Sequence, residues 1–219
     1  MSGSFDYNVV IRNIPFLWEG MQITLLLTVI AIFGGIFLGT LLALARLSPF
    51  SPLSFTAGSY VNFFRSMPLI LVIFWFYFLV PVIVGRPVGG FYSVLIAFVL
   101  FEAAYYCEII RAGIQSVRAD QINAGKALGL TYAQNMRYVV LPQAFRNMVP
   151  VLLTQGIILF QDTSLVYVVG VKDFLVSADL IANRENRLIE MFSAVALVYF
   201  ALCLTGSMLV RRLQRKYAL

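Results

Sequence analysis

The sequence contains no histidine and only two cysteines among its 219 residues. Both cysteines, Cys107 and Cys203, lie inside apolar runs, so neither a metal site nor a disulfide framework has enough ligands. Without histidine or a paired acid motif, an intramembrane enzyme lacks its base or its metal. No G-x-x-x-x-G-K-[ST] phosphate loop occurs, so the chain has no ATP-hydrolysing motif of its own. We therefore expect no catalytic residue, no metal and no bound cofactor.

Charge is also scarce. Only 12% of the residues are charged and 61% are hydrophobic, whereas about a quarter of the residues in a soluble domain carry charge. The composition therefore indicates that the solvent is a lipid bilayer. A net charge of +6 is compatible with nucleic acid, but the basic residues form no patch with interleaved aromatics and concentrate beside apolar segments. We expect a multi-pass membrane protein with no nucleic-acid partner.

Five segments are long and apolar enough to cross about 30 Å of hydrocarbon, which takes roughly 20 residues of helix. They cover residues 21–45, 66–84, 88–107, 148–171 and 191–210. The third contains one charged residue, Glu102, and the fourth contains one, Asp162. All five are expected to be helices, since open strands leave backbone groups unpaired in lipid. The expected fold is an all-α membrane protein in which residues 1–219 form a single transmembrane domain.

The distribution of basic residues predicts the orientation of these spans. With a cytoplasmic C-terminus, the inner side holds Arg46, Arg65, Arg111, Arg118, Lys126, Arg137, Arg146, Arg211, Arg212, Arg215 and Lys216. The outer side then holds Arg12, Arg86, Lys172, Arg184 and Arg187. Because cytoplasmic loops carry the excess of lysine and arginine, the N-terminus is expected outside. The N-terminal tail lacks a basic region and a cleavage site, so we expect the first span itself to direct insertion.

Residues 118–145 form the longest polar stretch of the chain, and this stretch is expected in the cytoplasm. Asp120 is predicted to cap a short helix that runs through Leu128, and Gly129 supplies the flexible position that ends it. Thr131 and Gln134 have the spacing of a capping box for a second helix, which is predicted to stop before Pro142. Two short helices at an angle are expected. A mere connector between two spans is the alternative, although connectors are more often short.

This stretch resembles the cytoplasmic signature loop of permease subunits in ATP-driven, binding-protein-dependent importers. The residues that carry the resemblance are Asn123, Ala124, Gly125, Leu128, Gly129, Val139, Leu141 and Pro142. Asn123 stands where glutamate is common in that family, Gly125 where a second alanine is common, and Val139 where isoleucine is common. The resemblance implies that the loop forms coupling helices that dock on a separate ATPase subunit.

Four further segments are similar to permeases of the polar amino acid branch. They are FRSMPL at 64–69, EIIRAGIQSV at 108–117, LPQAFRNMVP at 141–150 and QDTSLVYV at 161–168. FEAAYYCEIIRAGIQS and LFQDTSLVY most resemble the second permease subunit of glutamate/aspartate importers. The resemblance implies a bacterial inner-membrane complex of two identical or paralogous permeases, two ATPases that hold ATP and Mg²⁺, and a soluble substrate-binding protein outside.

Polar side chains inside the spans are candidates for the substrate path. A bare carboxylate near the bilayer centre costs roughly 2.5 to 3.5 kcal/mol, so Asp162 and Glu102 must face partners or water. Candidate neighbours of Asp162 are Gln155, Gln161, Thr163 and Ser164. For Asp162 the alternative to a path or gate is a hydrogen-bonded knot between helices. For Glu102 structural and path roles are weighed equally.

Three charged residues, Arg65, Glu108 and Arg111, lie near the inner ends of spans. Glu108 and Arg111 have the spacing of a structural ion pair on one helix face. Arg65 fits either an interfacial anchor or a path residue.

The mid-depth acids alone fit a cationic or neutral amino acid as well as an acidic one, so only the resemblance favours glutamate and aspartate. The alternatives are a permease for another polar or basic amino acid, or a stand-alone proton-coupled carrier that uses Glu102 and Asp162 as relay groups.

Overall fold

The computed structural model describes residues 5–86 and 88–217, and every regular element in these residues is a helix. In chain order the elements are α1 (Asn8–Arg12), α2 (Ile14–Arg46), α3 (Ser51–Arg65), α4 (Leu69–Phe74), the π-helical η1 (Trp75–Leu79), α5 (Val80–Val84), α6 (Gly90–Gln115), α7 (Ala119–Ala127), α8 (Tyr132–Asn135), the π-helical η2 (Met136–Val140), α9 (Leu141–Asp162), the 3₁₀-helical η3 (Thr163–Val169), α10 (Phe174–Glu185) and α11 (Leu188–Tyr217). The all-helical fold class is confirmed.

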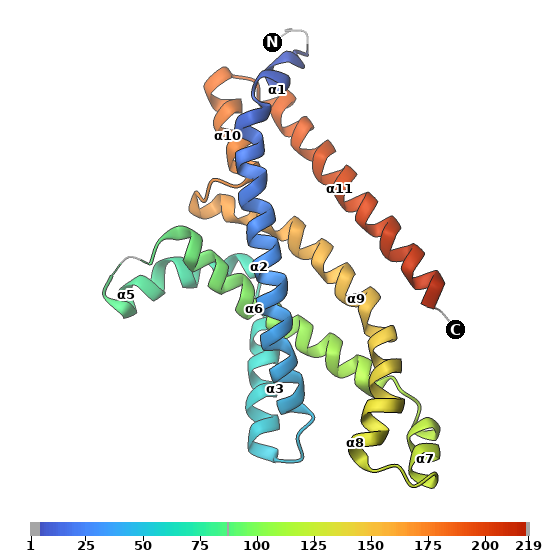
Figure 1. The fold of residues 1–219 in the computed structure, drawn as a ribbon. Coiled ribbons are helices and arrows are strands. Elements are labelled where there is room, and N and C mark those ends of the chain that lie inside the picture. Colours follow the sequence, from blue (N-terminus) through green and yellow to red (C-terminus); the bar gives the residue numbers. More distant parts are fainter. Residues whose placement is uncertain (1–4, 87, 218–219) are drawn as a thin grey trace.

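Four helices are long and apolar enough to span a bilayer. They cover Ile14–Arg46, Gly90–Gln115, Tyr132–Val169 and Leu188–Arg215, so each of them includes most or all of a predicted span and most extend beyond it. The extensions carry polar residues such as Gln115 and Arg215, which hydropathy alone leaves out of a span. Figure 1 shows α2 as a rod through the middle of the molecule, crossed by α6, with α11 diverging from it toward the C-terminus.

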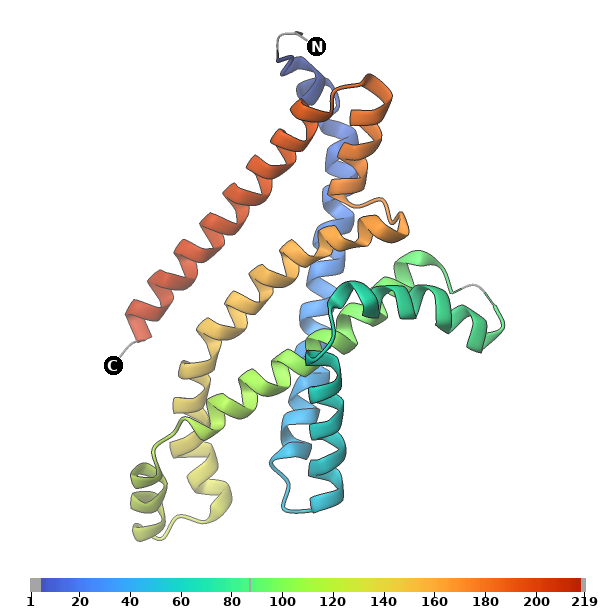
Figure 2. The same ribbon diagram turned by 180° about the vertical axis from the view of Figure 1, so that it is seen from behind.

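The span expected at residues 66–84 differs from the prediction. Ser51–Arg65 and Leu69–Val84 are both helical, but they meet at an angle of 103°, so together they form at most one broken span. Figure 2 shows the bend from behind, with α3 beside the lower part of α2 and the following segment turning away from it. Pro68 has an extended backbone, with φ −63° and ψ 135°, and a proline disfavours helical backbone at the residue before it. The break therefore falls at residues 66–68.

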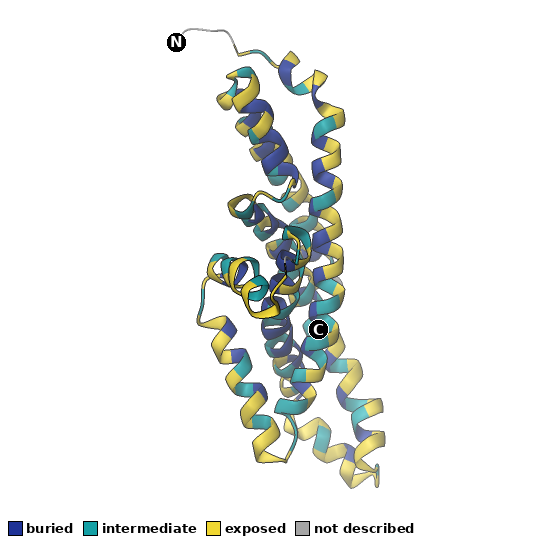
Figure 3. Cartoon of the chain, turned by 90° about the vertical axis from the view of Figure 1, so that its left-hand side faces the viewer, coloured by how far each residue is buried: buried dark blue, intermediate teal, exposed yellow. Residues whose placement is uncertain are grey.

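The main core lies where α2 crosses α6. Leu27, Ala31, Phe98 and Tyr106 are fully buried there. At Gly39, a β-carbon would lie 2.8 Å from Tyr106 Cβ and 2.9 Å from the backbone oxygen of Ala103, so only glycine allows this approach. The buried positions in Figure 3 follow this crossing, while the ends of the long helices are largely exposed.

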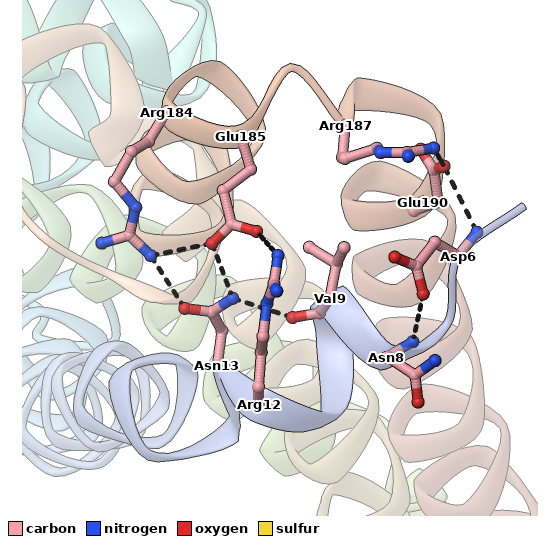
Figure 4. Close-up of polar contacts among 9 residues, drawn as sticks. All are labelled: Asp6, Asn8, Val9, Arg12, Asn13, Arg184, Glu185, Arg187 and Glu190. Atoms are coloured by element: carbon pink, nitrogen blue, oxygen red, sulfur yellow. Dashed lines mark hydrogen bonds and ion pairs between the residues drawn. The ribbon is translucent and has the colours of Figure 1, made fainter. Parts of the chain in front are cut away.

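A second core joins α1 and the start of α2 to α10 and α11, and a polar network closes its surface. Glu185 accepts a hydrogen bond from Asn13 Nδ2 at 3.1 Å and one from Arg184 at 3.0 Å, and it forms an ion pair with Arg12 (Figure 4). These hydrogen bonds, led by that of Arg184, lower the pKa of Glu185. Arg187 is paired with Glu190 at 3.0 Å. The network ties the N-terminal segment to the α10–α11 corner.

The turn before α10 contains a buried carboxyl group. Asp173 is fully buried and is the N-cap of α10, where its Oδ1 accepts a hydrogen bond from the Val176 N–H at 2.8 Å. Its Oδ2 has no hydrogen-bond partner among the described residues. Burial raises the pKa of Asp173 from 3.8 to about 6, although the backbone hydrogen bonds oppose that shift. The negative charge at this site is therefore unfavourable in the folded protein at neutral pH.

Replacing Asp173 with asparagine is expected to raise the melting temperature at pH 7.5 and to leave it unchanged near pH 4. The Asp173 carboxyl group binds its proton more tightly in the folded protein than in the unfolded chain. The wild type therefore loses stability as pH rises from about 4 to about 6. Asparagine keeps the cap and carries no charge. Melting of the purified protein in detergent from pH 4 to 8 measures the difference, and parallel profiles for the two proteins would contradict this account.

Candidate functional site

The 118–145 stretch contains two short helices, α7 and α8, and the second of them runs on through η2 into the start of α9 (Figure 1). Asn135 is buried, and its Nδ2 donates a hydrogen bond to the Ile122 backbone oxygen at 2.8 Å, which locks α8 against α7. Gly125 is buried against the Asn135 side chain, so a β-carbon at residue 125 would collide with it. The predicted pair of angled helices is therefore held by a specific contact and is not an unstructured connector.

Two of the local signals in this stretch are present as predicted. Gly129 follows α7 with a φ of +78°, a conformation that favours glycine. Thr131 caps α8 in a full capping box, in which its hydroxyl accepts from the Gln134 N–H and the Gln134 side chain accepts from the Thr131 N–H. Both helix boundaries therefore lie where the sequence placed them.

Two other signals in this stretch were misread. Asp120 is not the N-cap of α7: Arg118 occupies that position, and Asp120 lies in the first turn, paired with Arg118 at 2.8 Å. The second helix also does not stop before Pro142. It continues through the π-helical η2 into α9, so Pro142 lies inside a longer continuous helix. A proline inside a helix cannot donate an N–H to the preceding turn, and the π-helical turn Met136–Val140 lies directly before it.

Large apolar side chains on the two short helices are solvent-exposed. Leu128 is 82% exposed and Tyr132 is 80% exposed. Among the predicted coupling residues, Asn123, Ala124, Gly129, Leu141 and Pro142 are also exposed, Val139 is half-buried and Gly125 is buried. Exposed apolar side chains on an otherwise polar element are candidates for contact with a partner protein. Tyr132 is not among the predicted coupling residues, although an aromatic residue directly after a capping threonine in a polar loop was a usable signal.

In the middle of the long helices, Glu102 of α6 is paired with Gln155 of α9. Glu102 is fully buried, and both of its oxygens accept from Gln155 Nε2, at 3.1 and 3.3 Å. Gly35 of α2 packs directly on Glu102 and Tyr106. The structure therefore joins two predicted path residues that are distant in sequence.

Asp162, the last residue of α9, is half-buried and accepts no hydrogen bond from any side chain of residues 5–86 and 88–217. Its expected neighbours have other partners: the Thr163 and Ser164 hydroxyls donate to the Phe160 and Gln161 backbone oxygens, at 2.7 and 2.8 Å. The helix changes from α-helical to 3₁₀ geometry at Thr163, directly after Asp162.

Nearer to the two short helices, a cluster of three arginines surrounds Glu108. The predicted Glu108–Arg111 pair is present at 2.8 Å. Arg46 at the end of α2 also pairs with Glu108, and Arg65 at the end of α3 lies 3.7 Å from it. The sequence predicted only the Glu108–Arg111 pair; Arg65 was expected apart from it and Arg46 was not a candidate. Among the described residues no group of histidine, cysteine, aspartate and glutamate could hold a metal ion.

Comparison with known proteins places this chain among transport proteins. Residues 35–219 match the family described as "Binding-protein-dependent transport system inner membrane component". The "Glutamate/aspartate import permease protein GltK" of Escherichia coli O6:H1 is 48% identical, over 98% of this chain and 99% of that protein. The "Arginine transport system permease protein ArtQ" of Bacillus subtilis is 33% identical, over 97% of each chain.

Solved structures share the fold. A crystal structure of an amino acid ABC transporter with histidines contains a chain with a TM-score of 0.92 and 32% identity, and the match covers 99% of this chain and 100% of that one. The MetNI methionine ABC transporter, in an inward-facing conformation, contains a chain with a TM-score of 0.70 and 22% identity, covering 92% of this chain and 98% of that one.

Proposed function

The chain belongs to the family of inner membrane components of binding-protein-dependent transport systems, and from this premise we propose that it imports glutamate and aspartate. It is a permease subunit, the non-catalytic membrane component of an ABC amino acid importer. The observation that carries the substrate is the 48% identity, over nearly the full length, to a glutamate/aspartate permease. Relatives that act on arginine or glutamine are less similar, at 32 to 35% identity.

The proposed complex contains this chain, a second permease subunit that is either a paralogue or an identical copy, two ATPases and a binding protein on the outer side. ATP and Mg²⁺ are held by the ATPases. The N-terminus and the Glu185 network lie outside, and the C-terminus and residues 118–145 lie in the cytoplasm, as the distribution of basic residues indicates. Residues 123–129 and 139–142, together with Tyr132, dock on an ATPase, and ATP-driven closure moves α6 and α9 through them.

The proposed substrate path follows the polar face of α9. Asp162, with no side-chain partner among the described residues, receives the substrate ammonium group, and Gln161, Thr163 and Ser164 border it. Glu102 and Gln155 form the next polar layer. Arg65 lies farther along, toward the two short helices.

Replacing Asp162 with asparagine is expected to raise the apparent KM for uptake about tenfold or more, because the ion pair with the ammonium group is replaced by a hydrogen bond to a neutral amide oxygen. ATPase association should be unchanged, since Asp162 lies far from α7 and α8. Uptake kinetics and copurification of the variant measure these two effects. A variant that melts at lower temperature but keeps its KM would assign Asp162 to helix packing instead.

Competition for uptake tests the proposed substrate. Proteoliposomes that contain the whole complex and internal ATP take up radiolabelled glutamate in the presence of excess unlabelled aspartate, glutamine or arginine. We expect aspartate alone to compete strongly. Strong competition by arginine or glutamine, with weak competition by aspartate, would identify a permease for another polar or basic amino acid.

A further inference from the structure

An open cavity of about 440 Å³ lies beside the Glu108 cluster, on the side of α6 and α9 that leads to the two short helices. Its polar lining consists of Arg65, Glu108, Ser116 and Asn147, and Met148 and Val151 contribute apolar walls. Asn147 Nδ2 donates to the Ser116 hydroxyl at 2.8 Å. This volume is within the range of small-molecule sites in proteins, and an amino acid is at the small end of such ligands.

Arg65 and Glu108 both line this cavity, and two further arginines, Arg46 and Arg111, pair with Glu108. Three guanidinium groups surround the single Glu108 carboxylate, so the cluster carries an excess of two positive charges. Glu108 is engaged mainly by Arg46, which pairs with it closely, and by Arg111, which donates to both of its oxygens at 2.8 and 3.3 Å. Arg65 therefore makes the longest of the three ion pairs and shares this carboxylate with two closer arginines.

Arg65 is placed to use its charge on a ligand. It lies 3.7 Å from Glu108, makes no side-chain hydrogen bond within the described part of the chain, and its side chain is 42% exposed, against 21% and 26% for Arg46 and Arg111. The Tyr105 ring, 5.4 Å from the guanidinium carbon, supports it from one side. A guanidinium held at one edge and open at the other matches a carboxylate with two parallel hydrogen bonds.

The cavity continues the polar face of α9. Asp162, Gln155, Val151 and Asn147 are separated by seven, four and four residues, which places them on one face of a helix. The face therefore leads from Asp162 and Glu102, which suit an ammonium group, to the cavity beside the arginine cluster, which suits a carboxylate. A substrate that carries both groups meets these two places one after the other, and each place offers one of its groups a partner of opposite charge.

We propose that Arg65 binds the side-chain carboxylate of an acidic amino acid in this cavity, as the last protein contact before release toward the ATPase side. This inference rests on the proposed import function and adds a second binding position to it. The site selects for negative charge: an amide side chain of the same shape offers Arg65 one neutral carbonyl oxygen, without the ion pair and the second parallel hydrogen bond of a carboxylate.

Equilibrium binding of radiolabelled L-glutamate and L-glutamine to the purified complex, without the binding protein, tests this position. In Arg65→Gln the affinity for glutamate should fall roughly tenfold to a hundredfold, with the affinity for glutamine changed less than about twofold. Arg65→Lys keeps the charge but not the planar fork, so its affinity for glutamate should fall less than that of Arg65→Gln, and its affinity for glutamine should not change. Arg86→Gln, an exposed arginine elsewhere with the same change of charge, is the matched control.

Unchanged glutamate affinity in Arg65→Gln, or an equal loss for glutamate and glutamine, would overturn the inference. If the complex with Arg65→Gln does not assemble, the glutamate and glutamine affinities of Arg65→Lys are compared in the same way. ATP-driven uptake by the wild-type complex is measured in the same preparation. If the wild-type complex takes up glutamate but Arg65→Gln leaves glutamate affinity unchanged, only the Arg65 site is refuted. If the wild-type complex takes up no acidic amino acid, the proposed substrate is refuted.

Discussion

Replacing Leu128 with aspartate is expected to detach the ATPase from this chain and to lower ATP-driven uptake at least about tenfold. Leu128 is 82% exposed and packs against little of its own chain, so its replacement should leave the fold intact. Burying a leucine side chain at an interface contributes about 1.5 to 3 kcal/mol, and a carboxylate in the same position adds a desolvation cost. Because tenfold corresponds to about 1.4 kcal/mol, the leucine contribution alone predicts a loss of one to two orders of magnitude.

The matched control for this variant is Phe50→Asp. Phe50 is also a large exposed apolar residue, 64% exposed, and it lies in the turn between α2 and α3, outside the two short helices. Copurification of the ATPase and uptake in proteoliposomes are measured for both variants. Equal loss in both, or full ATPase binding by Leu128→Asp, would rule out a docking surface on α7 and α8.

Replacing Gly39 with alanine is expected to destabilise the folded protein by about 1 to 3 kcal/mol, because a β-carbon at residue 39 meets Tyr106 Cβ at 2.8 Å and the Ala103 backbone oxygen at 2.9 Å. A backbone oxygen cannot rotate away as a side chain can, so α2 and α6 must separate. Since the main core lies at this crossing, the melting temperature and the yield from the membrane should both fall.

Gly58→Ala provides the comparison. Gly58 is also inside a helix, but the nearest atom to a β-carbon there is Arg46 Nε at 3.9 Å, which is ordinary contact. Alanine is favoured over glycine within a helix by up to about 1 kcal/mol, so this variant should melt at or above the wild-type temperature. Equal melting of the two variants would show that the close approach at Gly39 does not support the fold.

Local chemistry made much of the fold predictable. Four long apolar helices follow from hydropathy, and the end of α7 and the start of α8 follow from Gly129 and from the capping box of Thr131 and Gln134. The sharp bend at residues 66–68 was missed because the apolar run after Pro68 reads as a span by composition alone. A proline in that run indicates a break, but its angle depends on how the two segments pack.

The candidate site was less predictable, because it depends on contacts between distant residues. Glu102 and Gln155 lie 53 residues apart, and no spacing rule joins them. Arg46 reaches Glu108 only because α2 and α6 cross near their ends. Asp162 was expected to have neighbours from its own turn, yet the nearby hydroxyl groups donate to the helix backbone instead. Short-range competition of this kind is typical of serine and threonine in helices.

We propose that nucleotide hydrolysis on a partner ATPase drives transport through this chain. The direct measurement is glutamate accumulation in proteoliposomes that contain the complete complex and the binding protein, with nucleotide supplied on the ATPase side and the proton gradient collapsed. We predict accumulation against the glutamate gradient with ATP and none with a non-hydrolysable analogue. Accumulation that needs no nucleotide and follows an imposed proton gradient would contradict this claim.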